Sequence, residues 1–172
     1  MKSVSFFAID TETTSIDYMS AQLVGVSFAV GVGEAAYLPL AHDYVGVPEQ
    51  VDFDKAINAL KPVLENESIA KVGQNLKYDL SIFASHGLTL KGELYDTMME
   101  SYVLNSVATR HNMDALARHY LDISTTSFED VAGKGASQLT FNQVSLDVAR
   151  DYAAEDADVT YRLHQKLWPL IE

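Results

Sequence analysis

Three groups of acidic side chains carry most of the chemistry that this sequence could perform. In the first, Asp10 and Glu12 follow the apolar run Phe6–Ile9, and residues two apart on a strand share a face. Two carboxylates that close repel each other, and each becomes harder to ionise unless a cation lies between them. About three acidic pairs at this spacing are expected by chance among 24 acidic residues in 172. A divalent-metal site is therefore an expectation that needs support from elsewhere in the chain.

The second group lies in the segment from Leu146 to Leu170, which the spacing of its apolar residues predicts to be one long amphipathic helix. Tyr152 and Asp156 are four residues apart and are therefore neighbours on one face of this helix. Asp156 falls within the apolar stripe, where a carboxylate is costly without a partner. Two interpretations stay open: Asp156 binds a metal ion, or it pairs with a nearby arginine or lysine.

The third group follows a short apolar strand predicted at residues 69–72. The chain turns at Gly73 and enters a predicted helix at residues 78–86, with Asp79 in its first turn. Acidic residues are common near helix N-termini because the helix dipole favours them, so Asp79 alone indicates little. Asp79 becomes a candidate functional residue only when it is considered together with the other two groups.

The elements predicted around these groups form a single α/β domain. Strands are expected near residues 4–10, 22–31, 34–40, 69–72 and 93–95, and helices near 54–65, 78–86, 97–105, 112–120 and 146–170, while residues 127–130 have the capping-box spacing that precedes one more short helix. Three antiparallel strands followed by alternating helices and strands predict a mixed β-sheet with helices on both faces. Such a scaffold can bring carboxylates from remote sequence positions to one place.

Composition fits a packed globular domain and limits the classes of function. Hydrophobic residues make up 48% of the chain, cysteine is absent, and the longest apolar run, near residues 23–32, is shorter than the ~20 residues that cross a bilayer. We expect a monomeric cytoplasmic protein with no membrane partner. The net charge of −12 opposes non-specific binding to duplex nucleic acid, so a nucleic acid would be held over a few terminal nucleotides.

Together, the three groups resemble the pattern of a known family. Four acidic residues and a tyrosine characterise the proofreading 3′→5′ exonucleases, which have a ribonuclease H-like fold, and the matching residues here are Asp10, Glu12, Asp79, Asp156 and Tyr152. Longer stretches resemble the proofreading domain of bacterial DNA polymerase I, namely Asp10–Thr13, Lys71–Asp79, Asp96–Met98, Leu139–Gln143 and Tyr152–Val159. The resemblance runs over nearly the whole chain. We expect residues 1–172 to be one exonuclease domain, excised from a longer polymerase chain or, as the alternative, a small stand-alone nuclease.

The resemblance implies hydrolysis of a phosphodiester with two divalent metal ions. Carboxylate ligands favour Mg²⁺, for which Mn²⁺ or Zn²⁺ could substitute. Asp10, Glu12 and Asp156 are expected to hold the ion that activates a water molecule. Asp10 would bridge to a second ion near the leaving 3′-oxygen, which Asp79 would bind directly or through water. Tyr152 would orient the attacking water, because a phenol with a pKa near 10 is a poor base at neutral pH.

Contacts to the 3′ end of single-stranded DNA are also implied by the resemblance. Ile16 and Phe128 are expected to be apolar wedges against the last bases. The polar residues expected near the terminal nucleotide or its phosphates are Thr11, Gln74, Asn75, Tyr78 and Arg110. Phe128 lies among serines and threonines, an unusual place for a core aromatic, although a packing role stays open for it and for Tyr78.

The predicted function is that of a 3′→5′ exodeoxyribonuclease, which releases 5′-mononucleotides from single-stranded or frayed DNA ends during DNA synthesis. Its expected partner is the polymerase domain of the same parent chain, and its expected setting is the bacterial nucleoid. Two alternatives stay open. An RNA 3′-end trimming nuclease of the ribonuclease D type would share the chemistry, since no residue here is an unambiguous gate against a 2′-hydroxyl group. A non-catalytic docking module would share only the fold.

Overall fold

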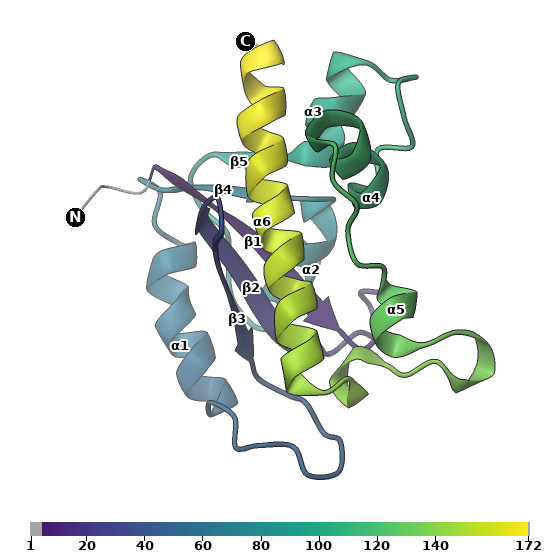
Figure 1. The fold of residues 1–172 in the computed structure, drawn as a ribbon. Helices are drawn as coiled ribbons and strands as arrows, with labels where there is room; N and C mark the ends of the chain where they lie inside the picture. Colours follow the sequence, from purple (N-terminus) through teal and green to yellow (C-terminus); the bar gives the residue numbers. More distant parts are fainter. Residues whose placement is uncertain (1–4, 172) are drawn as a thin grey trace.

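Five strands form one mixed β-sheet in the computed structural model, which describes residues 5–171 (Figure 1). The strand order is β3-β2-β1-β4-β5, and the strands are β1 (Phe6–Thr13), β2 (Leu23–Gly31), β3 (Glu34–Pro39), β4 (Ala70–Gly73) and β5 (Leu94–Asp96). The strand β2 pairs antiparallel with both β1 and β3, whereas β4 joins β1, and β5 joins β4, in parallel. The predicted order of three antiparallel strands followed by parallel additions is confirmed.

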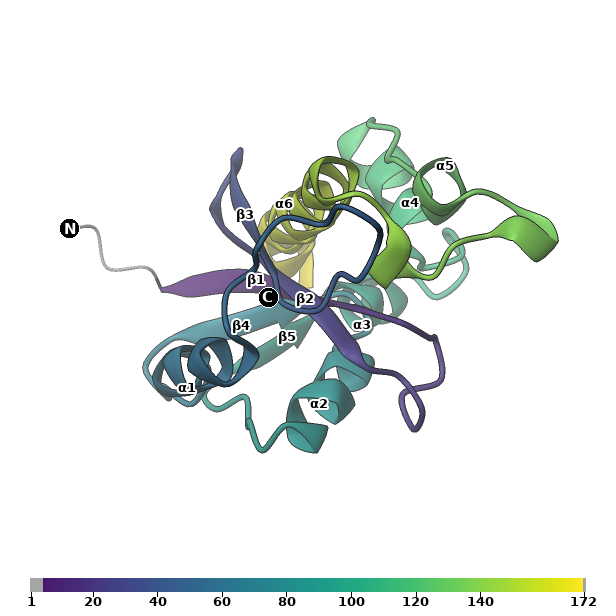
Figure 2. The ribbon, with the colours of Figure 1, turned by 90° about the horizontal axis from the view of Figure 1, so that it is seen from below.

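Helices cover both faces of this sheet, as predicted (Figures 1 and 2). Two helices, α1 (Phe53–Leu64) and α2 (Leu76–Ser85), lie on one side of the strands, and the long α6 (Leu146–Ile171) crosses the other side. Three shorter helices contact α6, namely α3 (Thr97–Leu104), α4 (Met113–Leu116) and α5 (Phe128–Ala132). Within residues 5–171, none of the helices combines the length and the apolar character that a bilayer crossing requires.

Alternation along β1 decides which helix layer each of its side chains meets. Odd-numbered residues such as Ile9 pack into the core that α1 and α2 share. Even-numbered residues point the other way, and Ala8 packs against Ala157 of α6. Asp10 and Glu12 are even-numbered, so the strand directs both carboxylates toward α6.

The strand that carries the first acidic pair is longer than predicted. It continues to Thr13, because the backbone of Asp10 to Glu12 pairs with Ser27 to Gly25 of β2. The two carboxylates therefore lie inside a paired strand rather than beyond its tip, which fixes their direction. Residue 4, where the first strand was predicted to begin, lies outside the described residues.

Two helix boundaries also differ from the prediction. Asn75 adopts a left-handed backbone conformation with φ of 60°, and α2 begins immediately after it, two residues earlier than expected. The helix predicted at residues 112–120 is α-helical over Met113–Leu116 and continues as a π-helical turn over Ala117–Leu121. Single 3₁₀ turns follow at Gly135–Ser137 and Phe141–Gln143.

Candidate active site

Asp10 and Glu12 of β1 and Asp156 of α6 bring their carboxylates together. One oxygen atom of each lies within 4.8 Å of the other two, so a single metal ion could be bound between them. The Oε1 atom of Glu12 is buried and accepts no hydrogen bond from the residues that the structure describes. An unpaired buried carboxylate oxygen is costly, and a hard cation would satisfy it. The donor set therefore fits an ion of the Mg²⁺ or Mn²⁺ type.

Burial makes all three of these carboxyl groups harder to ionise. It raises the pKa of Asp10 to about 7. The pKa of Glu12 is raised well above its usual range by burial first and by the charges of Asp10 and Asp156 second. Burial, and then the charge of Asp10, raise the pKa of Asp156 in the same way. A divalent cation would reverse these shifts because it favours the ionised forms, so the cluster is electrostatically incomplete without one.

Asp79 approaches the cluster from α2, on the opposite face of the sheet. Its Oδ1 atom accepts hydrogen bonds from the backbone N–H of Thr11 at 2.9 Å and from the Thr11 hydroxyl at 2.6 Å. Thr11 is an odd-numbered residue of β1 and therefore faces α2. Burial, and then the charge of Asp10, raise the pKa of Asp79 well above its usual range, as expected for neighbouring carboxylates. Thr11, predicted to contact substrate, thus also holds Asp79.

Tyr152 lies one turn before Asp156 on α6. Burial raises the pKa of its hydroxyl far above the usual value, and the charges of Asp156 and Glu12 add to the shift. The phenol is therefore protonated at any ordinary pH, and it can position a water molecule or phosphate by hydrogen bonding but cannot act as a base. Its ring packs beside Phe141 and Phe128, with ring centroids 5.9 and 6.5 Å away.

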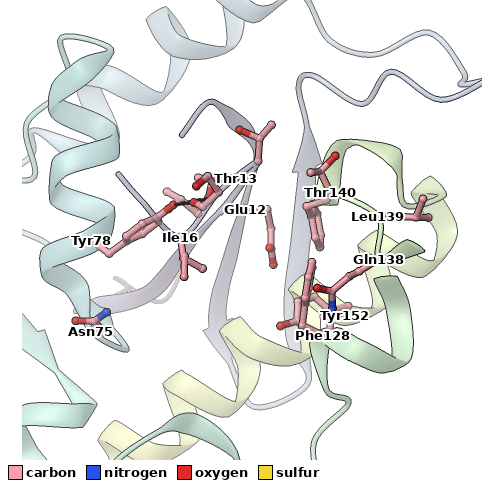
Figure 3. A pocket seen from close by; sticks show the side chains of 14 residues that line it. Glu12, Thr13, Ile16, Asn75, Tyr78, Phe128, Gln138, Leu139, Thr140 and Tyr152 are labelled. Carbon is pink, nitrogen blue, oxygen red and sulfur yellow. Dashed lines mark hydrogen bonds between the residues drawn. The ribbon is translucent and has the colours of Figure 1, made fainter. Parts of the chain in front are cut away.

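A pocket of about 720 Å³ opens beside Glu12 and Tyr152 (Figure 3). In Figure 3, Ile16, Asn75 and Tyr78 line one side, and the residues labelled on the other side are Phe128, Gln138, Leu139, Thr140 and Tyr152. Ile16 is 97% exposed and Phe128 is 37% exposed, so two apolar side chains stand on opposite sides of the opening. This volume is within the range of small-molecule and cofactor pockets in proteins.

Five of the seven predicted substrate contacts line this pocket: Thr11, Ile16, Asn75, Tyr78 and Phe128. Gln74 and Arg110 are not among the lining residues. The Gln74 side chain accepts a hydrogen bond from the Thr97 hydroxyl at 2.5 Å and donates one to the carbonyl of His111 at 2.9 Å. Gln74 therefore supports the backbone next to Arg110, whose side chain is exposed.

Residues 138–141 form one wall of the pocket, a role that was not predicted from the sequence. Phe141 is buried, and its ring packs near those of Tyr37 and Tyr152, with centroids 6.3 and 5.9 Å away. The sequence pointed to this run only through its resemblance to the family, because its residue types suggest no chemistry. The 3₁₀ turn Phe141–Gln143 contacts β1, and residues 138–141 line the same pocket as Glu12 of that strand.

Comparison of the sequence with known proteins matches the whole chain. A family model described as 3′-5′ exonuclease matches residues 1–172. DNA polymerase I of Pseudomonas aeruginosa is 60% identical over 174 residues, which cover 100% of this chain and 19% of that protein. The chain therefore spans about a fifth of the length of the curated relatives that it matches.

Solved structures with the same fold are more distant in sequence. Brucella melitensis NrnC with bound Mg²⁺ is similar with a TM-score of 0.68 at 22% identity, covering 98% of this chain and 74% of that one. Escherichia coli RNase D, an exoribonuclease involved in structured RNA processing, is similar with a TM-score of 0.69 at 18% identity, covering 97% of this chain and 40% of that one. These likenesses confirm the predicted ribonuclease H-like fold.

Proposed function

Since this chain belongs to the 3′-5′ exonuclease family and is similar to DNA polymerase I, we propose that it hydrolyses the terminal phosphodiester of single-stranded or frayed DNA and releases 5′-mononucleotides. The observation that carries this proposal is the convergence of Asp10, Glu12 and Asp156 at the edge of a pocket with apolar walls. We further propose that the domain works within a longer polymerase chain, beside the bacterial chromosome, where it would proofread DNA synthesis. The length and identity of its relatives support this extension.

The metal ligands in this proposal are the four carboxylates. Asp10, Glu12 and Asp156 would hold one Mg²⁺ ion, and Asp79 together with Asp10 would hold a second, with Mn²⁺ or Zn²⁺ as substitutes. Oxygen-only donors support the choice of a hard cation, as does the Mg²⁺ ion bound by the structurally similar NrnC. When bound, two such ions would supply a polarised attacking water and neutralise charge on the leaving 3′-oxygen.

The remaining side chains would select and hold the strand. Tyr152, which stays protonated, would fix the direction of attack by hydrogen bonding to the water molecule or the scissile phosphate. Ile16 and Phe128 would contact the faces of the last bases, a mode of binding that suits unpaired strands. The net charge of −12 disfavours extended contact with the phosphates of a duplex, which is consistent with recognition of only the terminal nucleotides.

RNA trimming is the second candidate function. The likeness to RNase D extends over the whole fold, which favours this alternative, whereas the 60% identity to a DNA polymerase I favours DNA. A docking role without catalysis is less well supported, because all four carboxylates and Tyr152 are present and three of the carboxylates converge.

The test is a nuclease assay with 5′-labelled single-stranded DNA and its RNA counterpart, in Mg²⁺, Mn²⁺ or EDTA. We expect a ladder that shortens from the 3′ end of DNA, depends on the metal, and is at least ~100-fold slower with Asp156→Asn. Asp158→Asn is the matched control, because Asp158 lies on the same helix but pairs with Arg162 at 2.7 Å and with the backbone of Gly33.

Three outcomes would contradict the proposal. Preferential degradation of RNA would identify the trimming activity instead. A folded protein that degrades neither substrate would indicate a docking module. Equal rates for Asp156→Asn and Asp158→Asn would mean that the converging carboxylates do not carry the reaction.

A further inference from the structure

Glu155 precedes Asp156 on α6, but it is turned away from the carboxylate cluster and toward the chain before α5. Its Oε1 atom accepts a hydrogen bond from the backbone N–H of Thr126 at 3.0 Å. Its Oε2 atom accepts a second from the Thr126 hydroxyl at 2.7 Å. Both oxygens are therefore engaged by one residue that is 29 positions earlier in the chain. Hydrogen bonds to an ionised carboxylate are stronger than those between neutral groups.

The residues that follow Thr126 carry one wall of the substrate pocket. Ser127 is the N-cap of α5, and it exchanges hydrogen bonds with Asp130 in a capping box. Phe128 is the first residue of α5, and its ring reaches the pocket mouth (Figure 3). Its centroid lies 6.5 Å from that of Tyr152 on α6. The place of Phe128 therefore depends on how the start of α5 is attached to α6.

The C-terminal end of α5 is anchored by Ala132, which is buried in one apolar cluster with Ala149 of α6, so the Glu155 hydrogen bonds act on the N-terminal end of α5. The helix α5 has five residues, far fewer than a helix needs to be stable alone. A second tether joins the Thr125 hydroxyl to Asp114 at 2.6 Å, but this contact is exposed to solvent and is correspondingly weak. The hydrogen bonds to Glu155 are part-buried, so they are the firmer link.

We propose that Glu155 is a positioning residue for substrate binding, whose carboxylate acts through Thr126 to hold Phe128 at the mouth of the pocket. The proposal rests on the proposed function, because that function gives Phe128 a base to contact. Two adjacent residues of α6 then have different tasks: Asp156 faces the metal site, and Glu155 sets the aromatic wall. The affinity for a single strand depends on Glu155 even when no divalent cation is present.

Substitutions at Thr126 test this without changing any charge. Thr126→Val removes the hydroxyl that donates to Glu155, whereas Thr126→Ser keeps it. The readout is binding of a short single-stranded DNA with 2-aminopurine at its 3′ end, measured in EDTA by the fluorescence of that base. We expect Thr126→Val to weaken binding about fivefold to tenfold and to reduce quenching by the aromatic wall. Thr126→Ser should restore both, and in Mg²⁺ the change should appear in KM more than in kcat.

A mutant cycle shows whether Glu155 acts through Phe128. Glu155→Ala should weaken binding at least as much as Thr126→Val in the parent protein, and should have almost no further effect once Phe128→Ala is present. Calorimetric titration with Mn²⁺ separates this role from metal ligation, because Glu155→Ala should bind Mn²⁺ like the parent whereas Asp156→Asn should not.

Three results would overturn the proposal. One is unchanged DNA binding by Thr126→Val. A second is an equal effect of Glu155→Ala with and without Phe128. The third is loss of Mn²⁺ binding in Glu155→Ala as large as in Asp156→Asn. A parent protein that neither binds nor degrades DNA would refute the proposed function together with this inference, whereas an active parent with unaffected variants refutes the inference alone.

Discussion

Glu12 and Asp79 are both buried carboxylates near Asp10, but the protein stabilises them differently. Asp79 accepts two hydrogen bonds from Thr11, so part of its environment is complete before any cation binds. The Oε1 atom of Glu12 has no such donor among the described residues. Glu12 therefore depends on a cation more than Asp79 does, and Thr11 matters chiefly to the orientation of Asp79.

This difference predicts the effect of Thr11→Val. The substitution removes a 2.6 Å hydrogen bond to a buried carboxylate while the backbone N–H stays in place. We expect a loss of about 1–3 kcal/mol in the free energy of unfolding, measured with denaturant in EDTA. Calorimetry should also show weaker binding of Mn²⁺. Thr11→Ser keeps the hydroxyl and is the control, so equal stability of the two variants would contradict this role.

At the scale of elements, Asp96 joins two helices to the end of the parallel part of the sheet. Its carboxylate accepts hydrogen bonds from the backbone N–H groups of Asn75 and Leu76 at the start of α2, and of Met98 at the start of α3. This is possible because β4 and β5 are parallel neighbours and end together, with Gly73 opposite Asp96. One side chain thus fixes the helix that carries Asp79.

Asp96→Ala should therefore destabilise the domain more than removal of an ordinary helix cap. It leaves three backbone N–H groups without their acceptor, and we expect a loss of about 2–4 kcal/mol in the free energy of unfolding. Asp52→Ala is the matched control, because Asp52 caps only α1 through Lys55 and should cost ~1 kcal/mol. If the two variants unfolded at the same denaturant concentration, the double-cap role of Asp96 would be wrong.

For the whole molecule, the buried acidic site lowers the stability of the metal-free fold. Four carboxyl groups with raised pKa values are enclosed in a chain of net charge −12, so ionising them without a cation opposes folding. The pKa of Asp10 is raised from 3.8 to about 7. The stability that its protonated form contributes is complete below pH 3.8 and is lost as the pH rises through about 7.

Asp10→Asn should consequently stabilise the metal-free domain at pH 8, by an amount on the order of 2 kcal/mol, and should have a smaller effect at pH 4.5. Saturating Mn²⁺ should stabilise the parent protein at pH 8 and have little effect on the variant, because only the parent keeps the full ligand set. Urea unfolding of the parent and the variant, at pH 8 and pH 4.5 and with EDTA or Mn²⁺, measures these differences in the free energy of unfolding. A variant that is less stable than the parent at pH 8 in EDTA would contradict the prediction.

The features that depend on short spacings could be predicted from the order of the amino acids alone. The i, i+2 pair at Asp10 and Glu12 and the i, i+4 pair at Tyr152 and Asp156 are local, because the pleat of a strand and the turn of a helix set which side chains share a face. The order of strands and helices followed from the same periodicities, and the motifs identified the family. The exact ends of β1 and α2 did not follow, because they depend on pairing with β2 and on the hydrogen bonds from Asn75 and Leu76 to Asp96.

The way in which these local groups meet depends on long-range packing. Glu155 and Asp156 are adjacent in sequence, and the phase of α6 against the sheet sends one to Thr126 and the other to Asp10. Gln74 supports a neighbouring loop, while residues 138–141 form a pocket wall, although neither placement has a local signature. Contacts between residues far apart in the chain arise from the packing of whole elements. Residue type and spacing specify each face of an element but not what that face will touch.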